Sequence, residues 1–325
     1  MSLDVDRGEV HLIDVAGVAF DEPFYAQTIR RALQSGAEQR VASVSASIPA
    51  AVARPAGLIF HVGRCGSTLL SRALGATGVF SVREPELLHP LLRNPAPVTA
   101  KWVSSLFGYF LQIAAVRNIP LVVKLSSHDG TFAHQLASGL VDPRIVLLTR
   151  SPEESVASLL SDPPRWSRVL YDEGDVPLAG RSVHVVNPQT AAEIYAEQWR
   201  RGVEAVRAVG GTDILEIDYD DLVRDLVGVV DRVRGWLALS RLDERQRRAV
   251  VDLATRDSKS SEGAMFEGIS RPTTLSAPTA LAVRRVVSPF DGGQPADREE
   301  PAGEMPIGTV DDVGFPVHQP SDDDG

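Results

Sequence analysis

The stretch FHVGRCGSTLLSRAL, residues 60–74, decides the expected fold. An apolar run at 57–62 leads into a turn bracketed by two glycines, and Ser-Thr then opens a run with helical spacing of apolar residues. In a parallel α/β sheet such a turn lies beyond the carboxyl end of a strand, where backbone N–H groups and a helix N-terminus attract anions. The stretch therefore predicts a strand, an anion-binding loop and a helix.

The residues of the loop limit which anion it can hold. Gly63 and Gly66 permit a tight backbone and close approach of a ligand, and the hydroxyl groups of Ser67 and Thr68 can donate hydrogen bonds. A triphosphate loop reads G-x-x-x-x-G-K-[ST], whereas here no lysine precedes the Ser-Thr pair. Arg64 instead offers a permanent charge and a bidentate fork for phosphate or sulfate oxygens. A glycine-rich turn without a ligand is the alternative.

Strand and helix patterns alternate on the carboxyl side of this loop. Short apolar runs predict strands at 79–82, 120–125, 144–149 and 213–219. Helical spacing predicts helices at 99–117, 130–139, 190–208, 220–238 and 243–255, and another that begins at Pro152. This alternation predicts an α/β fold, a three-layer, doubly wound parallel sheet with additional helices.

The rest of the chain divides by composition. Residues 1–53 read as an N-terminal extension with a short strand and a helix ended by Gly36, and residues 54–287 form the predicted main domain. Residues 288–325 hold ten acidic residues and one arginine, which accounts for −9 of the net charge of −10. This proline-rich tail is predicted to be disordered. The polar stretch 162–190 interrupts the alternation and predicts a loop that binds the acceptor or a solvated loop.

Composition excludes several classes of function. No apolar run approaches the roughly 20 residues of a membrane helix, and no signal-peptide pattern opens the chain. A single cysteine fits a reducing, cytoplasmic setting. Without a basic stripe we expect no nucleic-acid partner, and without clustered histidines or cysteines we expect no metal.

The loop also carries a family resemblance. GRCGSTLLSRAL, residues 63–74, resembles the 5′-phosphosulfate loop of sulfotransferases that use 3′-phosphoadenosine 5′-phosphosulfate (PAPS), whose bacterial members often read G-R-S-G-S-T-L-L. Cys65 replaces the usual serine and is a poorer hydrogen-bond donor. The resemblance implies the P-loop-like sulfotransferase fold and PAPS as co-substrate, with the phosphosulfate bound by residues 63–68.

A second motif supports the same family. RIVLLTRSPEESVASLL, residues 144–160, resembles the family's element for the 3′-phosphate, a strand followed by an arginine and by a serine eight residues later. Arg150 and Ser158 match that spacing, and a guanidinium can fork a dianionic phosphate. Taken singly, Arg150 could instead form a surface ion pair with Glu153 or Glu154, and Ser158 could be an ordinary helix-surface serine.

Two weaker matches concern the rest of the donor. ILEIDYDDLVRD, residues 214–225, resembles the family's strand followed by Y-E-D-L, which implies that Tyr219 stacks on adenine. A core tyrosine at a strand end is the alternative. The polar segment 255–263 lies where the family has a further phosphate-binding loop, so that Lys259 could reach the 3′-phosphate or belong to a solvated loop.

The resemblance also implies candidate catalytic residues. Arg64 takes the place of the family's loop lysine and would meet the charge that develops on the leaving oxygen. Glu84, after the second strand, lies where many members carry a glutamate base, and a helix N-terminal glutamate is its alternative. His128 is displaced by two positions from the histidine base of cytosolic members. Lys124 matches the lysine before that histidine and would assist transfer or pair with a carboxylate.

Cys65 is also a possible thiol nucleophile, because a helix N-terminus near Arg64 predicts a lowered pKa for its thiol. No matching triad accompanies it. The function predicted is sulfuryl transfer from PAPS to a hydroxyl or amine of a small-molecule or glycan acceptor. A P-loop kinase or other phosphotransferase, and a non-catalytic nucleotide-binding protein of the same fold, are the alternatives. The sequence does not specify the acceptor or the oligomeric state.

Overall fold

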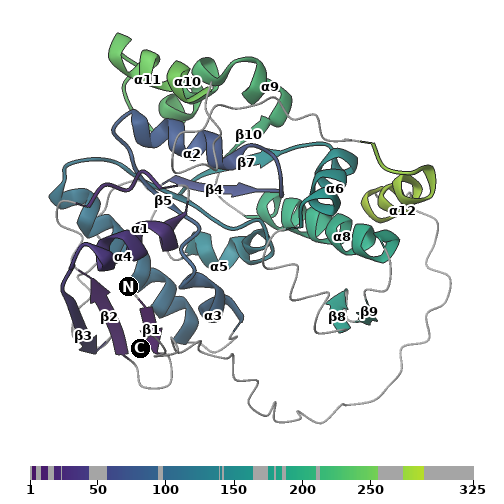
Figure 1. The fold of residues 1–325 in the computed structure, drawn as a ribbon, viewed down its shortest axis with the longest axis horizontal. Helices are drawn as coiled ribbons and strands as arrows, with labels where there is room; N and C mark the ends of the chain where they lie inside the picture. Colours follow the sequence, from purple (N-terminus) through teal and green to yellow (C-terminus); the bar gives the residue numbers. More distant parts are fainter. Residues whose placement is uncertain are drawn as a thin grey trace, which may run out of the picture. The chain divides into compact units, whose positions relative to one another are not determined.

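A computed structural model gives the fold of the chain (Figure 1). The chain divides into two units, Met1–Ser288 and Pro289–Gly325. The residues that the structure describes are 2–4, 9–13, 18–22, 24–43, 57–93, 98–138, 140, 143–163, 175–178, 181–184, 188–209, 213–254 and 274–288. The tail and Lys259 lie outside them, so the predictions made for both stay predictions.

A five-stranded parallel sheet forms the centre of the first unit. Its strands, in spatial order, are β10 (Ile214–Asp218), β7 (Arg144–Thr149), β4 (Gly57–His61), β6 (Leu121–Lys124) and β5 (Phe80–Arg83). The chain leaves the central strand β4 toward β5 and β6 on one side, and continues through β7 and β10 on the other. The loops after β4 and β7 therefore diverge, which opens a crevice at their carboxyl ends.

Helices cover both faces of this sheet, which confirms the predicted doubly wound α/β class (Figure 1). One face carries α2 (Ser67–Ala76), α10 (Leu226–Trp236) and α11 (Glu244–Ala254). The other carries α4 (Val98–Val116), α5 (Ala133–Ser138) and α8 (Pro188–Arg207). The remaining described helices are α3 (Leu88–Arg93), the 3-10 turn η2 (Asp129–Phe132), α6 (Pro152–Ser161), α9 (Tyr219–Arg224) and α12 (Ala277–Val287).

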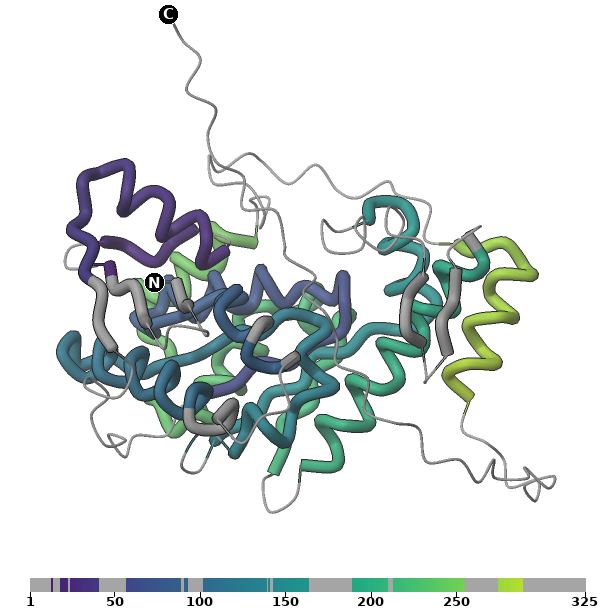
Figure 2. Tube along the Cα trace, turned by 90° about the horizontal axis from the view of Figure 1, so that it is seen from below, coloured from purple at the N-terminus to yellow at the C-terminus, as the bar shows by residue number. Residues whose placement is uncertain are grey.

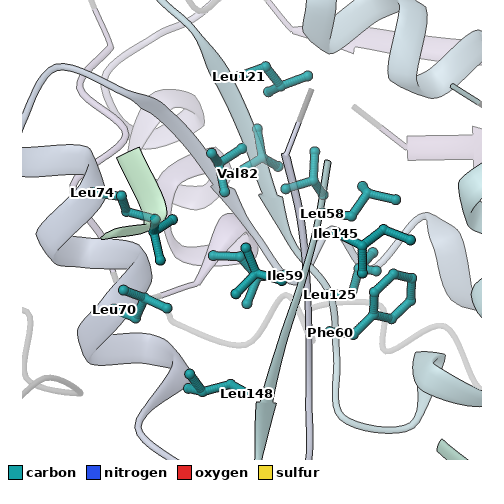
Figure 3. Close-up of a cluster of buried hydrophobic side chains, with 14 of the residues drawn as sticks. Leu58, Ile59, Phe60, Leu70, Leu74, Val82, Leu121, Leu125, Ile145 and Leu148 are labelled. Atoms are coloured by element: carbon teal, nitrogen blue, oxygen red, sulfur yellow. The ribbon is translucent and has the colours of Figure 1, made fainter. Parts of the chain in front are cut away.

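The apolar core follows from the sheet's alternation of side chains. Ile59 of β4 points toward Leu70 and Leu74 of α2, whereas its neighbours Leu58 and Phe60 lie on the opposite face (Figure 3). Each of these five side chains is fully buried. Because parallel strands covered on both faces need apolar residues at every position, the continuous run at 57–62 is explained.

Two predicted elements differ in the structure. The helix predicted at 220–238 is two helices, because Asp225 ends α9 and its carboxylate accepts the Gly228 N–H to cap α10. The element predicted at 130–139 begins as the turn η2 before α5. There Gly130 packs against Gly202 of α8, where an added Cβ would come within 3.0 Å of the Gly202 Cα. That close approach of α8 requires glycine at 130.

The N-terminal segment contains β1 (Ser2–Asp4), β2 (Glu9–Ile13) and β3 (Gln39–Ser43), which pair antiparallel, and α1 (Tyr25–Gln34). It packs on the core through Phe20, whose ring meets that of Phe80 edge to face with centroids 4.8 Å apart. The buried guanidinium of Arg83, in β5, donates hydrogen bonds to the carbonyls of Phe20 and Glu22. The predicted domain boundary at residue 54 stays a prediction.

Two further elements lie toward the C-terminal side of the sheet. Within the interrupting stretch, β8 (Asp175–Leu178) and β9 (Arg181–His184) form an antiparallel hairpin. Helix α12 packs along α8 and α6, as Figure 2 shows in yellow, and buries Val283 against Val156 and Tyr195. Sequence reasoning did not predict α12. In the part of the chain that is described, no helix has the length and apolar character needed to span a membrane.

Candidate active site

The loop between β4 and α2 has the strained backbone of an anion-binding turn. Gly66, the N-cap of α2, has φ 78°, and a Cβ there would lie 2.7 Å from Leu222. Arg64 also has a positive φ, 63°, which costs a non-glycine residue free energy. Ser67 and Thr68 begin the helix directly behind these residues and are buried. Their position matches the prediction that α2 starts at the Ser-Thr pair.

The side chain of Arg64 lies against the end of helix α6. Its Nη2 is 2.7 Å from the Oδ2 of Asp162 and also donates to the Asp162 backbone carbonyl. Arg64 exposes 12% of its side chain, whereas Asp162 exposes 42%. Because the carboxylate is partly solvated, another anion can replace it as the partner of Arg64.

Arg150 joins the two predicted motifs. Its Nη1 donates to the backbone carbonyl of Arg64 at 3.2 Å, and its Nε lies 3.4 Å from the Glu154 carboxylate. Its guanidinium carbon stands 4.3 Å from the centre of the Tyr219 ring, a cation–π contact. The indole of Trp199 donates to the Arg150 carbonyl. The sequence-predicted residues Arg64, Arg150 and Tyr219 therefore lie together at the crevice between β4 and β7.

Helix α6 brings two serines to this region. Ser158 is half-buried two helical turns beyond Arg150, as its spacing predicted. Ser155 is the serine that holds the loop, because its hydroxyl donates to the Gly63 carbonyl at 2.6 Å. Sequence reasoning missed Ser155. The available signal was its place one turn before Ser158, on the same helix face.

Glu84 and Lys124 form an ion pair at the ends of β5 and β6. The Lys124 ammonium donates to Oε1 of Glu84, and the Glu84 N–H donates to the Lys124 carbonyl at 2.7 Å. Lys124 is completely buried, whereas Glu84 exposes 27% of its side chain. Glu84 has φ 51°, so it is a second strained non-glycine residue in the region. The sequence predicts that Lys124 either assists transfer or pairs with a carboxylate, and in the structure it pairs with the Glu84 carboxylate.

The candidate bases lie close enough for their charges to interact. Burial acts to raise the pKa of Glu84, but the charge of Lys124, its hydrogen bond and the nearby histidines together hold that pKa below its ordinary value. His128, at the start of η2, contributes in the same direction. His128 exposes 23% of its side chain and lies 3.7 Å from Asp129. Glu84 and His128 thus lie near each other, in the segments that follow the adjacent strands β5 and β6.

His61 ties β4 to β6. Its two ring nitrogens each lie 2.8 Å from a carbonyl oxygen, that of Val62 and that of Leu125. Burial, with help from the charge of Lys124, lowers its pKa to about 4, so the ring is neutral at pH 7. A neutral imidazole has one N–H and donates to one of the two carbonyls. His61 is therefore a hydrogen-bonded residue of the core.

The prediction of a lowered pKa for Cys65 is wrong. The thiol is fully buried and donates to the Val62 carbonyl at 2.9 Å. Burial raises its pKa to about 12, which Lys124 and hydrogen bonds from Ser67 offset only in part. The neighbouring helix N-terminus does not compensate for this desolvation. Cys65 is therefore an inward-facing residue of the loop.

A pocket lies behind the loop, against α8. Its polar lining consists of His61, Ser127, Ser155, Tyr195 and Gln198. None of the residues that line it carries a formal charge at pH 7, since His61 is neutral. Among the described residues, no three His, Cys, Asp or Glu side chains are grouped to hold a metal ion.

The chemistry of the side chains fits a nucleotide that carries two anionic groups. The Arg150 guanidinium contacts the backbone of the loop that leads into α2, Arg64 belongs to that loop, and the Tyr219 ring lies against Arg150. Guanidinium forks match phosphate and sulfate oxygens, and the Tyr219 ring offers a face for a base. The partly exposed carboxylates that now contact the guanidiniums are exchangeable for such anions.

Several solved structures are similar to this chain. The sulfotransferase domain of the Synechococcus PCC 7002 olefin synthase has 19% identity and a TM-score of 0.44, over 75% of this chain and 98% of that one. Sulfotransferase STF9 from Mycobacterium avium has 15% identity and a TM-score of 0.46, over 73% of this chain and 76% of that one. Mouse sulfotransferase SULT7A1 complexed with PAP has 13% identity and a TM-score of 0.38, over 73% of this chain and 77% of that one.

No family model matches the chain, and no curated protein matches it. At these levels of similarity, the function has to be argued from the residues of this chain.

Proposed function

We propose that this protein is a sulfotransferase that moves a sulfuryl group from PAPS to a hydroxyl or amine of a small-molecule or glycan acceptor. The observation that carries the proposal is the contact between the two motifs, in which Arg150 donates to the Arg64 carbonyl. This contact joins one arginine of each motif, and the loop lacks the lysine that a triphosphate loop needs, which together support a phosphosulfate donor over a triphosphate.

Each predicted donor residue has a role in this proposal. The loop from Gly63 to Thr68 holds the 5′-phosphosulfate, with Arg64 on the bridging and sulfuryl oxygens. Arg150 and Ser158 hold the 3′-phosphate. Tyr219 stacks on adenine once Arg150 turns from the ring to the phosphate, an exchange that the cation–π contact allows at small cost. Lys259 completes the phosphate site from outside the described residues.

Glu84 is the proposed base for the acceptor. It is ionised at neutral pH, since Lys124 keeps its pKa low, and it is partly exposed beside the loop. His128 is the second candidate, because it lies near Glu84 and is also partly exposed.

A thermal-shift comparison tests the proposed donor. We expect 3′-phosphoadenosine 5′-phosphate (PAP) at saturating concentration to raise Tm by several degrees, because a ligand that binds only the native state stabilises it by mass action. ATP with Mg²⁺ should raise Tm little. Arg150→Ala should abolish the PAP shift, whereas Arg248→Ala, a control on the exposed face of α11, should retain it.

The outcomes separate the possible functions. Stabilisation by ATP–Mg²⁺ alone would favour a phosphotransferase and overturn the proposal. Binding of PAP without any turnover of labelled PAPS across an acceptor library would favour a non-catalytic nucleotide-binding protein. Formation of a labelled sulfated product identifies both the activity and the acceptor.

A further inference from the structure

Lys124 is a cation that the fold encloses completely. It is the last residue of β6, none of its surface is exposed, and its ammonium donates to the Glu84 carboxylate. The pairing of β5 with β6 places Arg83 opposite Lys124, so Glu84 is the next residue beyond the end of the ladder. Sheet register therefore brings the backbones of the two residues together.

An enclosed charge is costly unless it is paired. Removing an ammonium from water costs several kcal/mol even after relaxation, and a carboxylate partner offsets most of that cost. Lys124 pairs with Ile59 of β4 across the sheet, and its charge acts to lower the pKa of both His61 and Cys65. A bound anion cannot reach this ammonium unless the pair with Glu84 opens.

Glu84, by contrast, contacts both the protein interior and the solvent. Its Oε1 accepts from the enclosed Lys124, yet 27% of the side chain is exposed. Its backbone is fixed by the hydrogen bond from its N–H to the Lys124 carbonyl and is held at a positive φ. Strained residues that the surrounding structure over-determines are common at functional sites. The orientation of this carboxylate is thus fixed at two points by one residue.

We propose that Lys124 is a positioning residue that sets the charge state and the orientation of Glu84, so that the Glu84–Lys124 pair acts as one base. This inference rests on the proposed sulfuryl transfer. In that step Glu84 takes the proton of the acceptor O–H while the acceptor oxygen bonds to sulfur. The bond from sulfur to the bridging oxygen breaks, and its electron pair leaves with PAP.

The pair also explains how the base is restored. When Glu84 is protonated it becomes neutral, and the enclosed ammonium of Lys124 loses its counter-charge. That state is unfavourable, so the proton is released to solvent through the exposed part of the Glu84 side chain. A base held this way stays ionised between turnovers.

The charged and titratable groups facing Glu84 determine its response to pH. They are Lys124 from β6, His61 from β4 and His128 from the loop after β6. Burial alone would raise the pKa of Glu84, and these groups together lower it. Removal of the Lys124 charge should leave burial dominant, so the carboxyl should titrate at higher pH.

An NMR titration of protein labelled with ¹³C at glutamate carboxyl carbons tests whether Lys124 lowers the pKa of Glu84. The Glu84→Gln variant identifies the Glu84 signal by its loss. We expect Glu84 to titrate below the ordinary glutamate range in the wild type and above it in Lys124→Met. Lys124→Arg, which keeps the charge, should restore the low value. Arg234→Met is the matched control, because it removes a buried cation that contacts Thr77 instead of Glu84. An unchanged Glu84 titration in Lys124→Met would overturn the proposal.

A second measurement covers the case in which Lys124→Met does not fold. Because the folded pKa of Glu84 is lowered, its ionisation stabilises the native state above the unfolded pKa, and this stability is lost as pH falls through the folded pKa. The advantage of the wild type over Glu84→Gln in urea unfolding should therefore shrink below about pH 4. A pH-independent difference contradicts the proposal.

Failure of the proposed function gives a different result. If PAP does not bind the wild type, the sulfotransferase assignment fails whatever the Glu84 titration shows. If PAP raises Tm equally in the wild type and in the Glu84 and Lys124 variants, the donor site is intact. The titration then tests the pair alone.

Discussion

Two kinds of cation–carboxylate contact lie at the carboxyl edge of the sheet, and their surroundings differ. At the donor crevice, Arg64 contacts Asp162 and Arg150 contacts Glu154, and both carboxylates expose about two fifths of their side chains. At the ends of β5 and β6, Lys124 is enclosed and its partner Glu84 is mostly covered. The first contacts can exchange for a ligand, whereas the second cannot exchange without leaving a buried charge.

This difference indicates different functions for Arg64, Arg150 and Lys124, which are all cations that follow or end a strand of the sheet. The guanidiniums of Arg64 and Arg150 are mostly buried but their carboxylate partners are partly exposed, so a phosphate or sulfate that replaces a carboxylate leaves the guanidinium paired. An enclosed ammonium acts only through the group that it already contacts. Arg64 and Arg150 therefore fit ligand binding, and Lys124 fits the control of Glu84.

The largest expected effect comes from Arg64→Ala. If Arg64 meets the charge on the leaving oxygen, turnover of labelled PAPS should fall by about 100- to 1,000-fold, as for loss of one donor in a preorganised site. Arg224→Ala removes an arginine that is 72% exposed and serves as the control. Turnover of the Arg64→Ala variant within a few-fold of the wild type would show that Arg64 is not catalytic.

The reactivity of the Cys65 thiol should show whether the inner side of the loop is closed to solvent. With its pKa raised to about 12, little thiolate exists at pH 8, so reaction with N-ethylmaleimide should be at least about 100-fold slower than in urea-unfolded protein. Loss of free thiol against time measures this. Equal rates in the two states would mean that the inner side of the loop is open to solvent.

The smallest expected effect comes from Asp162→Asn. The Asp162 carboxylate competes with a bound anion for Arg64, so without it PAP should bind about two- to fivefold more tightly, as for the loss of a partly exposed ion pair. Calorimetric titration measures the affinity. Glu153→Gln, which lies on the same helix and pairs with Arg284, should leave it unchanged. Weaker binding in Asp162→Asn would mean that Asp162 positions Arg64 for the ligand.

Local patterns predicted the elements around the crevice well. Helix α2 and strand β7 have the bounds read from the sequence, 67–76 and 144–149, because glycine, proline and apolar runs define them locally. The break between α9 and α10 was missed, since Asp225 looks like an ordinary surface residue of a long helix until its capping role is seen.

The enclosed pair could be predicted only in part. Lys124 and Glu84 are 40 residues apart, and their contact depends on β5 lying beside β6, which no local pattern specifies. The role of Cys65 was misjudged for a related reason. Sequence shows its helix N-terminus and its neighbour Arg64, but the desolvation that raises its pKa comes from packing.

The buried guanidinium of Arg83 has a practical consequence for shortening the chain. Residues 20 and 22 supply the carbonyls that it binds, and Arg83 immediately precedes Glu84. A protein that starts at residue 54 would leave this guanidinium without those acceptors and would uncover Phe80. Stability and the geometry of the neighbouring carboxylate should both suffer. A trimmed protein for crystallisation should therefore keep the chain from residue 18 onward.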